Sequence, residues 1–575
     1  MKKYFILIAI ALGLLSCSLE EKRTSFANRG SCYETVFQMR SVVNSCYIPI
    51  KQMMNYSFGM GMEAATDLWY DNTSVADAIC DITPTKSGQA KNIWTYCYKG
   101  VMYCNEAITC MENSTSVPNK DKEPLIAECH VLRALYYYYL TCVFNGVPYY
   151  TYMVEDMETL AKIRQLPRTD ADVIRNNLYK DLKDNALPYF TEANGYWRRT
   201  SEIDGNRAGA PLALMLMAKM MMWNEDWDAA LEALGQLEKL YGTLNEERYP
   251  LKDTWWSVKN TAESIFEVQH AWSPDGIQSG GAYCRLLYPS IDNGTLDGIY
   301  MPYFGTQLTS HSVLRCTDYF AHWRPASNTF IKKDDGKTSL FDPLPLTWGE
   351  YNLEWQRYSA VLDFDAIKSG TIRGRKIDKR VLHVIGMGDL WNYGQYDTAE
   401  PTPDDKTFNS IRKNGRGYGG PKFWFPGMVS NNDGNNYKIF RYADAVLMMA
   451  ECWCMKNELD KAVSYLSQTR QRAGVDPFTT NDQGAMMSFI RDERARELAG
   501  EMHRRFDLVR WGIWYDAILA NNKGNIIKYI KPCHRFYPIP DKECSLSGGI
   551  LTNPEYEGIA DGGREETGEE QFEDE

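Results

Sequence analysis

The stretch between Tyr437 and Trp511 constrains the fold most, because apolar residues recur in it at helical spacing. A first apolar face is followed by an interruption at Asn457-Glu458 and then by a second apolar face that stops at Gly474, as a helix C-cap does. The small residues of the first face let the second helix approach closely, so we expect a tight antiparallel helix pair. The positions that define the two faces are Ala443, Val446, Leu447, Ala450 and Cys454, then Leu459, Ala462, Val463 and Leu466.

A third segment, Phe489 to Trp511, is dense in charged residues. Paired carboxylates such as Glu493 and Glu497, one helical turn apart, could serve acid–base chemistry. The alternative is an ion-pair network between helices, for which arginine is well suited because it holds two carboxylate oxygens at once. We favour the network and predict no catalytic role for its members, which are Arg441, Asp444, Glu493, Arg494, Glu497, Arg505 and Asp507.

The same residues carry a family resemblance. Four segments resemble, in order and spacing, the C-terminal signature of the SusD/RagB family. They are Arg441–Asp444, Arg470–Gly474, Asp492–Arg494 and Arg505–Leu508. The later motifs FYPIP, from Phe536 to Pro540, and NPEY, from Asn553 to Tyr556, are similar to its closing motif.

This resemblance implies an outer-membrane lipoprotein of Bacteroidetes-type bacteria that binds nutrient oligomers. It also implies a partner, a SusC-type TonB-dependent transporter, which receives the captured oligomer. The family is not enzymatic.

The N-terminus is typical of a lipoprotein signal. Lys2 and Lys3 precede a short apolar run that ends in LLSC, with cysteine at position 17. The apolar run is too short to span a bilayer. We therefore predict a signal peptide over residues 1–16, lipid attachment at Cys17, and a flexible linker over residues 17–29. An ordinary signal peptide with an incidental cysteine is the alternative.

The composition narrows the classes of partner and site. The formal charge of −12 argues against nucleic acid, since phosphate binding needs a basic surface. The seven histidines are widely separated, so we expect no metal site, and the fifteen cysteines mostly suit small core positions. No phosphate-binding loop or nucleophile elbow occurs, so we expect no cofactor and no enzyme activity.

The rest of the chain predicts a mostly α-helical fold. Trp227–Ala230 and Leu459–Ala462 share a turn followed by an apolar-x-x-Ala start, which is typical of tetratricopeptide-like repeats. We expect a helical solenoid built from residues 30–245 and 437–530. Residues 250–436 form a long irregular, loop-rich insertion with short strands, which is a usual place for a binding site. The SusD-like domain thus spans residues 30–555, and the acidic tail over residues 556–575 is predicted to be disordered.

The ligand-binding prediction rests on aromatic residues beside short polar ones. Aromatic faces stack on sugar rings, while Asp and Asn bond to hydroxyl groups. Trp69 could instead plug the core, and this alternative stays open. The candidate residues are Asp67, Trp69, Tyr70 and Asn72 in one loop, and Trp272, Tyr283, Tyr300, Tyr303 and Trp323 in the insertion.

Several functions compete, and among them a purely structural scaffold would bind no ligand at all. Glycan capture for a transporter comes first, the same role for peptides second, and a secreted helical glycan hydrolase or peptidase with an unrecognised site is the alternative of another class. The sequence does not name the ligand, because the loops that choose it match no motif.

Overall fold

The computed structural model describes the two ends of the domain almost completely. It covers residues 30–71, 82–86, 88–271 except 255 and 257, 434–522 and 526–558. Between residues 272 and 433 it describes only short pieces: residues 287, 314–317, 319–320, 371–372, 375–376, 378–380, 384–386, 418–419 and 421–423.

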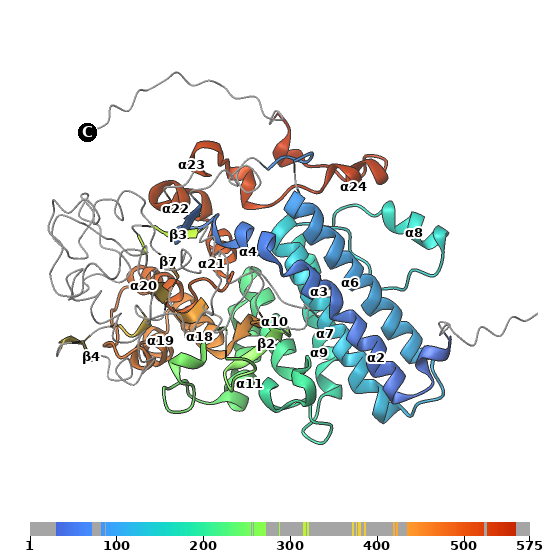
Figure 1. Ribbon diagram of the computed structural model, residues 1–575, viewed down its shortest axis with the longest axis horizontal. Coiled ribbons are helices and arrows are strands. Elements are labelled where there is room, and N and C mark those ends of the chain that lie inside the picture. Colours follow the sequence, from blue (N-terminus) through green and yellow to red (C-terminus); the bar gives the residue numbers. More distant parts are fainter. Residues whose placement is uncertain are drawn as a thin grey trace, which may run out of the picture.

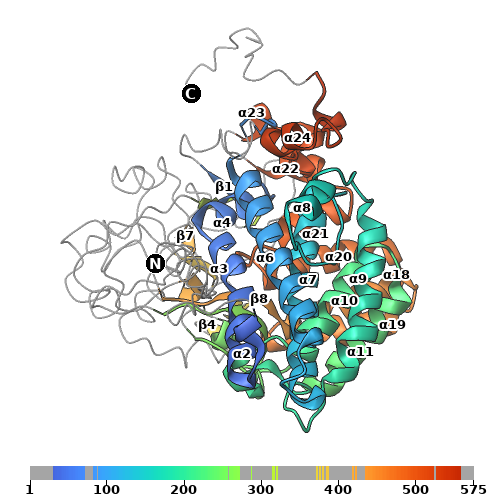
Figure 2. The same cartoon turned by 90° about the vertical axis from the view of Figure 1, so that its right-hand side faces the viewer.

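Antiparallel helix pairs packed in series form the scaffold. The chain reaches α18 from α11 only after the insertion, yet these two helices pack against each other. The array can be followed from α2 to α19 in Figure 2. This serial packing is consistent with a tetratricopeptide-like solenoid. Its helices are α2 (Val36–Cys46), α6 (Gly88–Asn113), α7 (Asn119–Phe144), α9 (Ala171–Asn185), α10 (Ala210–Trp223), α11 (Trp227–Tyr241), α18 (Tyr442–Met455), α19 (Leu459–Arg472) and α20 (Gln483–Glu497).

The two turns that suggested a repeat share one backbone geometry. Glu225 and Asn457 lie two residues before α11 and α19 and have φ angles of 58° and 60°. In each turn a backbone amide bonds to the carbonyl five residues earlier, from Asp226 to Met221 and from Glu458 to Trp453, both at 2.9 Å. A left-handed residue with this bond closes a helix C-terminus, so the sequence similarity reflects one repeated turn.

Shorter elements surround this array (Figure 1). The hydrophobic pattern of residues 30–56 suggests one first helix, but the structure divides it, with a break just before Pro49. Helix α21 (Arg504–Arg510) follows α20 after a break at residues 498–503, where the sequence suggested one continuous segment. The other helices are α3 (Ile48–Met53), α4 (Tyr56–Glu63), α8 (Met157–Arg164), α22 (Trp514–Asn521), α23 (Ile526–Tyr529) and α24 (Asp541–Leu546).

Among the described residues, four small antiparallel ladders accompany the helices. Strand β8 (Tyr437–Arg441) pairs with β2 (Ser264–Val268), so the stretch that begins at Tyr437 starts as a strand and becomes helical only at Tyr442. Strand β1 (Trp69–Asp71) pairs with β3 (Leu314–Cys316). The remaining pairs are β4 (Thr371–Ile372) with β5 (Arg375–Lys376), and β6 (Ile385–Gly386) with β7 (Tyr418–Gly419).

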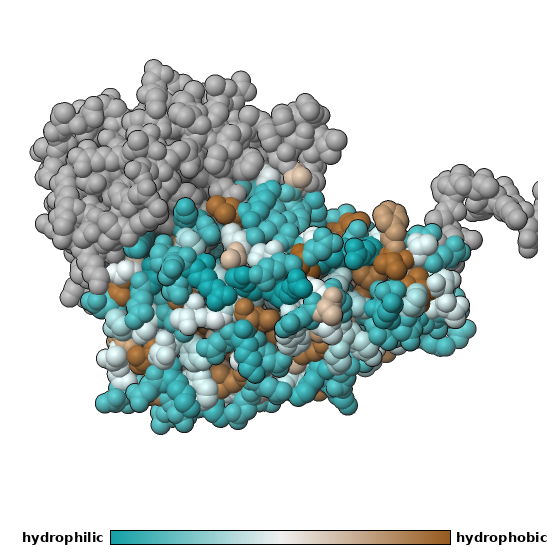
Figure 3. Space-filling view, turned by 90° about the horizontal axis from the view of Figure 1, so that it is seen from below, coloured by the Kyte–Doolittle hydropathy of each residue, from teal (hydrophilic) through white to brown (hydrophobic). Residues whose placement is uncertain are grey.

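Side chains of the paired helices fill the core. The tyrosine run of α7 lies entirely inside it, as do the methionines of α10. On the face seen in Figure 3, hydrophobic residues are scattered among hydrophilic ones. Within the described ranges, no helix combines the length and the apolar character that a membrane span requires.

A buried ion-pair network joins the strands, the scaffold and pieces of the insertion. Glu497, at the end of α20, contacts Arg441 from β8 at 2.7 Å and Arg380 from the insertion at 3.1 Å, and it also pairs with Arg472. Arg441 further contacts Glu263 and Glu501 at 2.8 Å each. These side chains are at most 3% exposed, so the network lies in the core.

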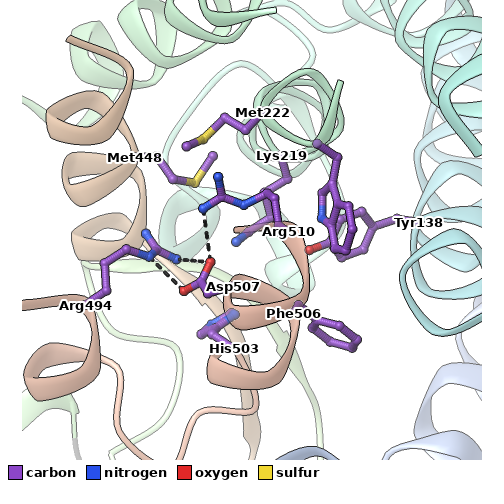
Figure 4. A pocket seen from close by; sticks show the side chains of 10 residues that line it. Tyr138, Lys219, Met222, Met448, Arg494, His503, Phe506, Asp507 and Arg510 are labelled. Atoms are coloured by element: carbon purple, nitrogen blue, oxygen red, sulfur yellow. Dashed lines mark hydrogen bonds and ion pairs between the residues drawn. The ribbon is translucent and has the colours of Figure 1, made fainter. Parts of the chain in front are cut away.

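The other predicted members lie in the same region. Arg494 contacts Asp444 at 2.9 Å and Asp507 at 2.8 Å (Figure 4), while Arg380 contacts Glu493 at 2.7 Å. The Arg505 guanidinium donates to the His534 carbonyl at 2.7 Å and lies over the rings of Trp514 and Tyr537.

The network holds its carboxylates ionised. Burial alone would raise the pKa of Glu493, but the charges of Arg380 and Arg496 outweigh it and lower this pKa to about 2. Glu501 behaves alike, with Arg441 and Lys422 lowering its pKa to about 2 against the effect of burial. A general acid needs a pKa near the working pH, so these carboxylates are unsuited to proton transfer at neutral pH.

Replacing Glu497 by Gln should destabilise the fold, because it removes the carboxylate that Arg441, Arg472 and Arg380 share. We expect a loss of about 3–5 kcal/mol in the free energy of unfolding, measured by urea denaturation. Lys162→Ala is the matched control, because it breaks an exposed pair with Glu158 and should cost less than about 1 kcal/mol. A Glu497→Gln variant as stable as wild type that loses ligand binding would place the network in a binding site instead.

Candidate functional site

Strand β1 carries the described part of the predicted ligand loop. Trp69 and Asp71 are buried and Tyr70 between them is half-buried, as expected where successive side chains of a strand point to opposite faces. Tyr70 is thus the candidate residue of β1 that reaches the surface.

The Trp69 side chain faces the core. It is 0% exposed, and its ring centroid lies 5.2 Å from that of Phe320 and 6.5 Å from that of Phe423. Both partners belong to the region 250–436, so the insertion covers this indole. The prediction that Trp69 presents a stacking surface is therefore wrong for this structure, and the core alternative describes it.

The Asp67 carboxylate is also occupied within the fold. It accepts two hydrogen bonds from the Arg504 guanidinium, at 2.8 and 2.6 Å, and is 2% exposed. Burial lowers the pKa of Arg504, but the charge of Asp67 outweighs burial and raises it above its usual value. The predicted bond from Asp67 to a sugar hydroxyl is replaced by this ion pair, which ties the segment before β1 to α21.

Described pieces of the insertion are anchored around this strand. The Thr317 hydroxyl donates to the Asp67 carbonyl at 2.5 Å, and the Tyr319 hydroxyl donates to the Asp492 carboxylate at 2.6 Å. Lys422 contacts Glu501 at 2.5 Å, and the Trp256 amide donates to the Lys422 carbonyl at 2.8 Å. β1 is therefore held between the C-terminal helices and the insertion, and Tyr70 is its half-buried residue.

Sequence reasoning missed the residues that position this strand. Three of these side chains come from segments without a regular spacing of apolar residues, so no sequence pattern marks them as anchors of the insertion. They are Arg380, Lys422 and Tyr319. The remaining candidates lie outside the described residues: Asn72, Trp272, Tyr283, Tyr300, Tyr303 and Trp323.

Family profiles match both ends of the chain. The profile of the SusD family matches residues 375–556. A SusD-like profile described as starch-binding associating with outer membrane matches residues 23–187. The two matched ranges contain the helices of the scaffold's ends and most of the buried ion-pair network.

Two SusD-like proteins align over nearly the whole chain. SusD-like protein P25 of Formosa agariphila is 25% identical, with 95% of this chain and 97% of the relative covered. SusD-like protein P2 of the same organism is 22% identical, with 96% and 99% covered.

Solved structures share the fold. A SusD homologue from Bacteroides thetaiotaomicron superposes with a TM-score of 0.65 at 18% identity, over 93% of this chain and 99% of that one. A laminarin-binding SusD-like protein gives 0.61 at 20% identity, over 91% and 100%. Surface glycan-binding protein A from Bacteroides thetaiotaomicron, in complex with laminarihexaose, gives 0.61 at 17% identity, over 90% and 98%.

The motifs at the C-terminal end of the sequence agree with the two family profiles, with the two relatives that align along nearly their full length, and with the shared fold. The chain belongs to the SusD/RagB family.

Proposed function

We propose that this protein is a surface-exposed outer-membrane lipoprotein that binds nutrient glycans and passes them to a SusC-type TonB-dependent transporter. The observation that carries the proposal is the agreement of family and fold with structures whose names give a glycan ligand, laminarin or laminarihexaose. Fold likeness alone does not determine the ligand, so the choice of glycan over peptide rests on those relatives and on the aromatic residues of this chain.

The ligand-binding face is proposed to include Tyr70 at the surface of β1. The proposed platform is completed by Asn72 and by aromatic residues of the insertion, which are Trp272, Tyr283, Tyr300, Tyr303 and Trp323. Tyr70 is half-buried on β1, which pairs with β3, and the preceding Asp67 carbonyl accepts a hydrogen bond from Thr317. A ring on a strand fixed in this way loses little conformational freedom when a sugar stacks on it.

A hydrolase is the candidate of another class, and the electrostatics disfavour it. The paired carboxylates of α20 each contact arginine and have lowered pKa values. Glycoside hydrolysis needs one carboxyl group with a raised pKa as general acid. Incubation of the pure protein with candidate glycans and peptides separates binding from turnover, since a hydrolase would release shorter products.

Neighbouring residues of β1 should respond differently to substitution. Tyr70→Ala should weaken glycan binding about tenfold, the effect of losing roughly 1.4 kcal/mol from a stacking contact. Trp69→Ala should instead destabilise the fold by about 3–5 kcal/mol, because it opens a cavity beside Phe320 and Phe423. Binding is measured by calorimetry with laminari-oligosaccharides, starch oligosaccharides and a peptide mixture, and stability by urea denaturation.

Tyr189→Ala serves as the control for Tyr70→Ala, because Tyr189 is a partly exposed tyrosine on the helical scaffold, 39% exposed. It should bind the glycan as wild type does. Equal binding by Tyr70→Ala and wild type would move the site away from β1.

Lipid attachment at Cys17 should be lost on substitution by alanine. Radioactive palmitate should label the wild-type chain and the control variant Cys32→Ala, but not Cys17→Ala, because the thiol at position 17 is the proposed acceptor. Labelling of Cys17→Ala to the wild-type level would disprove the assignment.

The transporter should remain bound to the lipoprotein in mild detergent. An obligate interface of this kind buries more than about 2,000 Å², so purification of a tagged chain should recover a second, larger outer-membrane protein. Recovery of this chain alone in several detergents would contradict the partnership.

A further inference from the structure

Three thiols meet inside the helical scaffold. They belong to Cys46 at the end of α2, Cys104 in α6 and Cys129 in α7, and each residue is 0% exposed. The Cys46 side chain shares hydrogen bonds with the side chains of both other cysteines, so one sulfur atom lies within hydrogen-bonding distance of two others. All three residues are free cysteines in the structure.

Hydrogen bonds between neighbouring residues fix the contact between Cys46 and Cys129. The Tyr136 hydroxyl, two turns after Cys129 in α7, donates to the Cys46 carbonyl at 2.6 Å. The Tyr47 hydroxyl donates to the carboxylate of Glu128, which directly precedes Cys129. Because the residues that flank the two cysteines bind each other, α2 is held in one register along α7.

Helix α6 approaches α7 closely at the same level. The Arg133 guanidinium of α7 donates to the side-chain oxygen of Asn105, which directly follows Cys104, at 2.9 Å. Gly100, one turn before Cys104, permits the close approach, because a Cβ atom there would lie only 2.2 Å from the Tyr136 ring. The three helices pack against one another, so the three thiols are brought together by the fold itself.

Thiols in such contact can be joined by oxidation. A disulfide S–S bond is about 2.05 Å long, so two thiols at hydrogen-bonding distance need only a small rotation of their side chains to reach it. The reaction removes two protons and two electrons from the thiol pair and forms one S–S bond. Outside the cytoplasm the electrons pass to the disulfide of a thiol oxidoreductase, which is reduced to a dithiol.

We propose that Cys46 forms a disulfide with Cys104 or Cys129 once the chain has been exported. Cys46 is the constant member because its sulfur contacts both others, and the third thiol stays free. The thiols are buried in the folded chain, so the bond forms before α2 has packed against α6 and α7. It would tie the first α-helix after the proposed lipid anchor to the scaffold. The inference rests on the proposed function only for the export of the chain.

Tryptic mapping of the wild-type chain tests the bond directly. The three cysteines lie in separate tryptic peptides, residues 41–51, 100–120 and 123–133. The chain is isolated from the membrane fraction, which also shows its export, and is then denatured and alkylated without reductant. Peptide 41–51 should be linked to 100–120 or 123–133, and reduction should release it. Peptide 100–120 also contains Cys110, which fragment ions distinguish from Cys104.

Two results would overturn the proposal. Peptide 41–51 could be recovered unlinked, with Cys46 alkylated, or it could be linked through a cysteine other than the two named. Either result, obtained on chain from the membrane fraction, leaves the proposed export intact, so failure of the bond and failure of the proposed function are distinguishable.

Thiol counting compares Cys46 with a matched buried cysteine. In denaturant, Cys46→Ala should titrate with one thiol more than wild type, because the substitution frees the partner of Cys46. The control is Cys97→Ala, since Cys97 is equally buried in α6 but its thiol lies 3.4 Å from the sulfur of Met53. It should titrate with one thiol fewer than wild type. One thiol fewer for both variants would contradict the bond.

Discussion

The buried pairing of arginines with the glutamates at the end of α20 is the interaction on which the rest of the structure depends. Arginine and lysine side chains from β8, from α19 and from the insertion form ion pairs with three carboxylates, those of Glu493, Glu497 and Glu501. Removing any one partner leaves a charge in a medium that solvates it poorly, and this costs several kcal/mol. The network therefore ties together segments that are far apart in sequence, because each is needed to neutralise the others.

This arrangement explains how a loop-rich insertion can present a defined surface. Arg380 and Lys422 hold two pieces of it against α20, and β2 pairs with β8 directly before α18. Strand β1 is fixed in turn by Asp67 on Arg504 and by Trp69 against aromatic rings of the insertion. The solenoid supplies rigidity, and the insertion supplies the strand β3 that pairs with β1, on which Tyr70 lies half-buried. A rigid scaffold that positions irregular segments is the arrangement expected of a binding protein.

Trp69 shows why a loop motif does not reveal which of its residues meet a ligand. A loop with glycine, aromatic and acidic residues suits a sugar-binding surface and also suits a segment that packs into the core. These two roles differ only in which side of the strand faces the insertion. Alternation along β1 buries Trp69 and Asp71 and leaves Tyr70 between them. The register of that strand depends on its pairing with residues 314–316, about 245 positions away, and no local pattern encodes it.

The helix pairs could be predicted from the sequence, because each helix must bury an apolar face that is visible as a 3.6-residue period. The sequence also determined the caps at Gly474 and at the two repeated turns, where local backbone chemistry suffices. The family motifs marked the charged residues of the C-terminal helices. The partners of those residues, the strand at residues 437–441 and the burial of Asp67 and Trp69 became known only from the folded chain. These features arise from contacts between distant segments, and the energy of a charge or a ring there depends on neighbours that the local sequence does not specify.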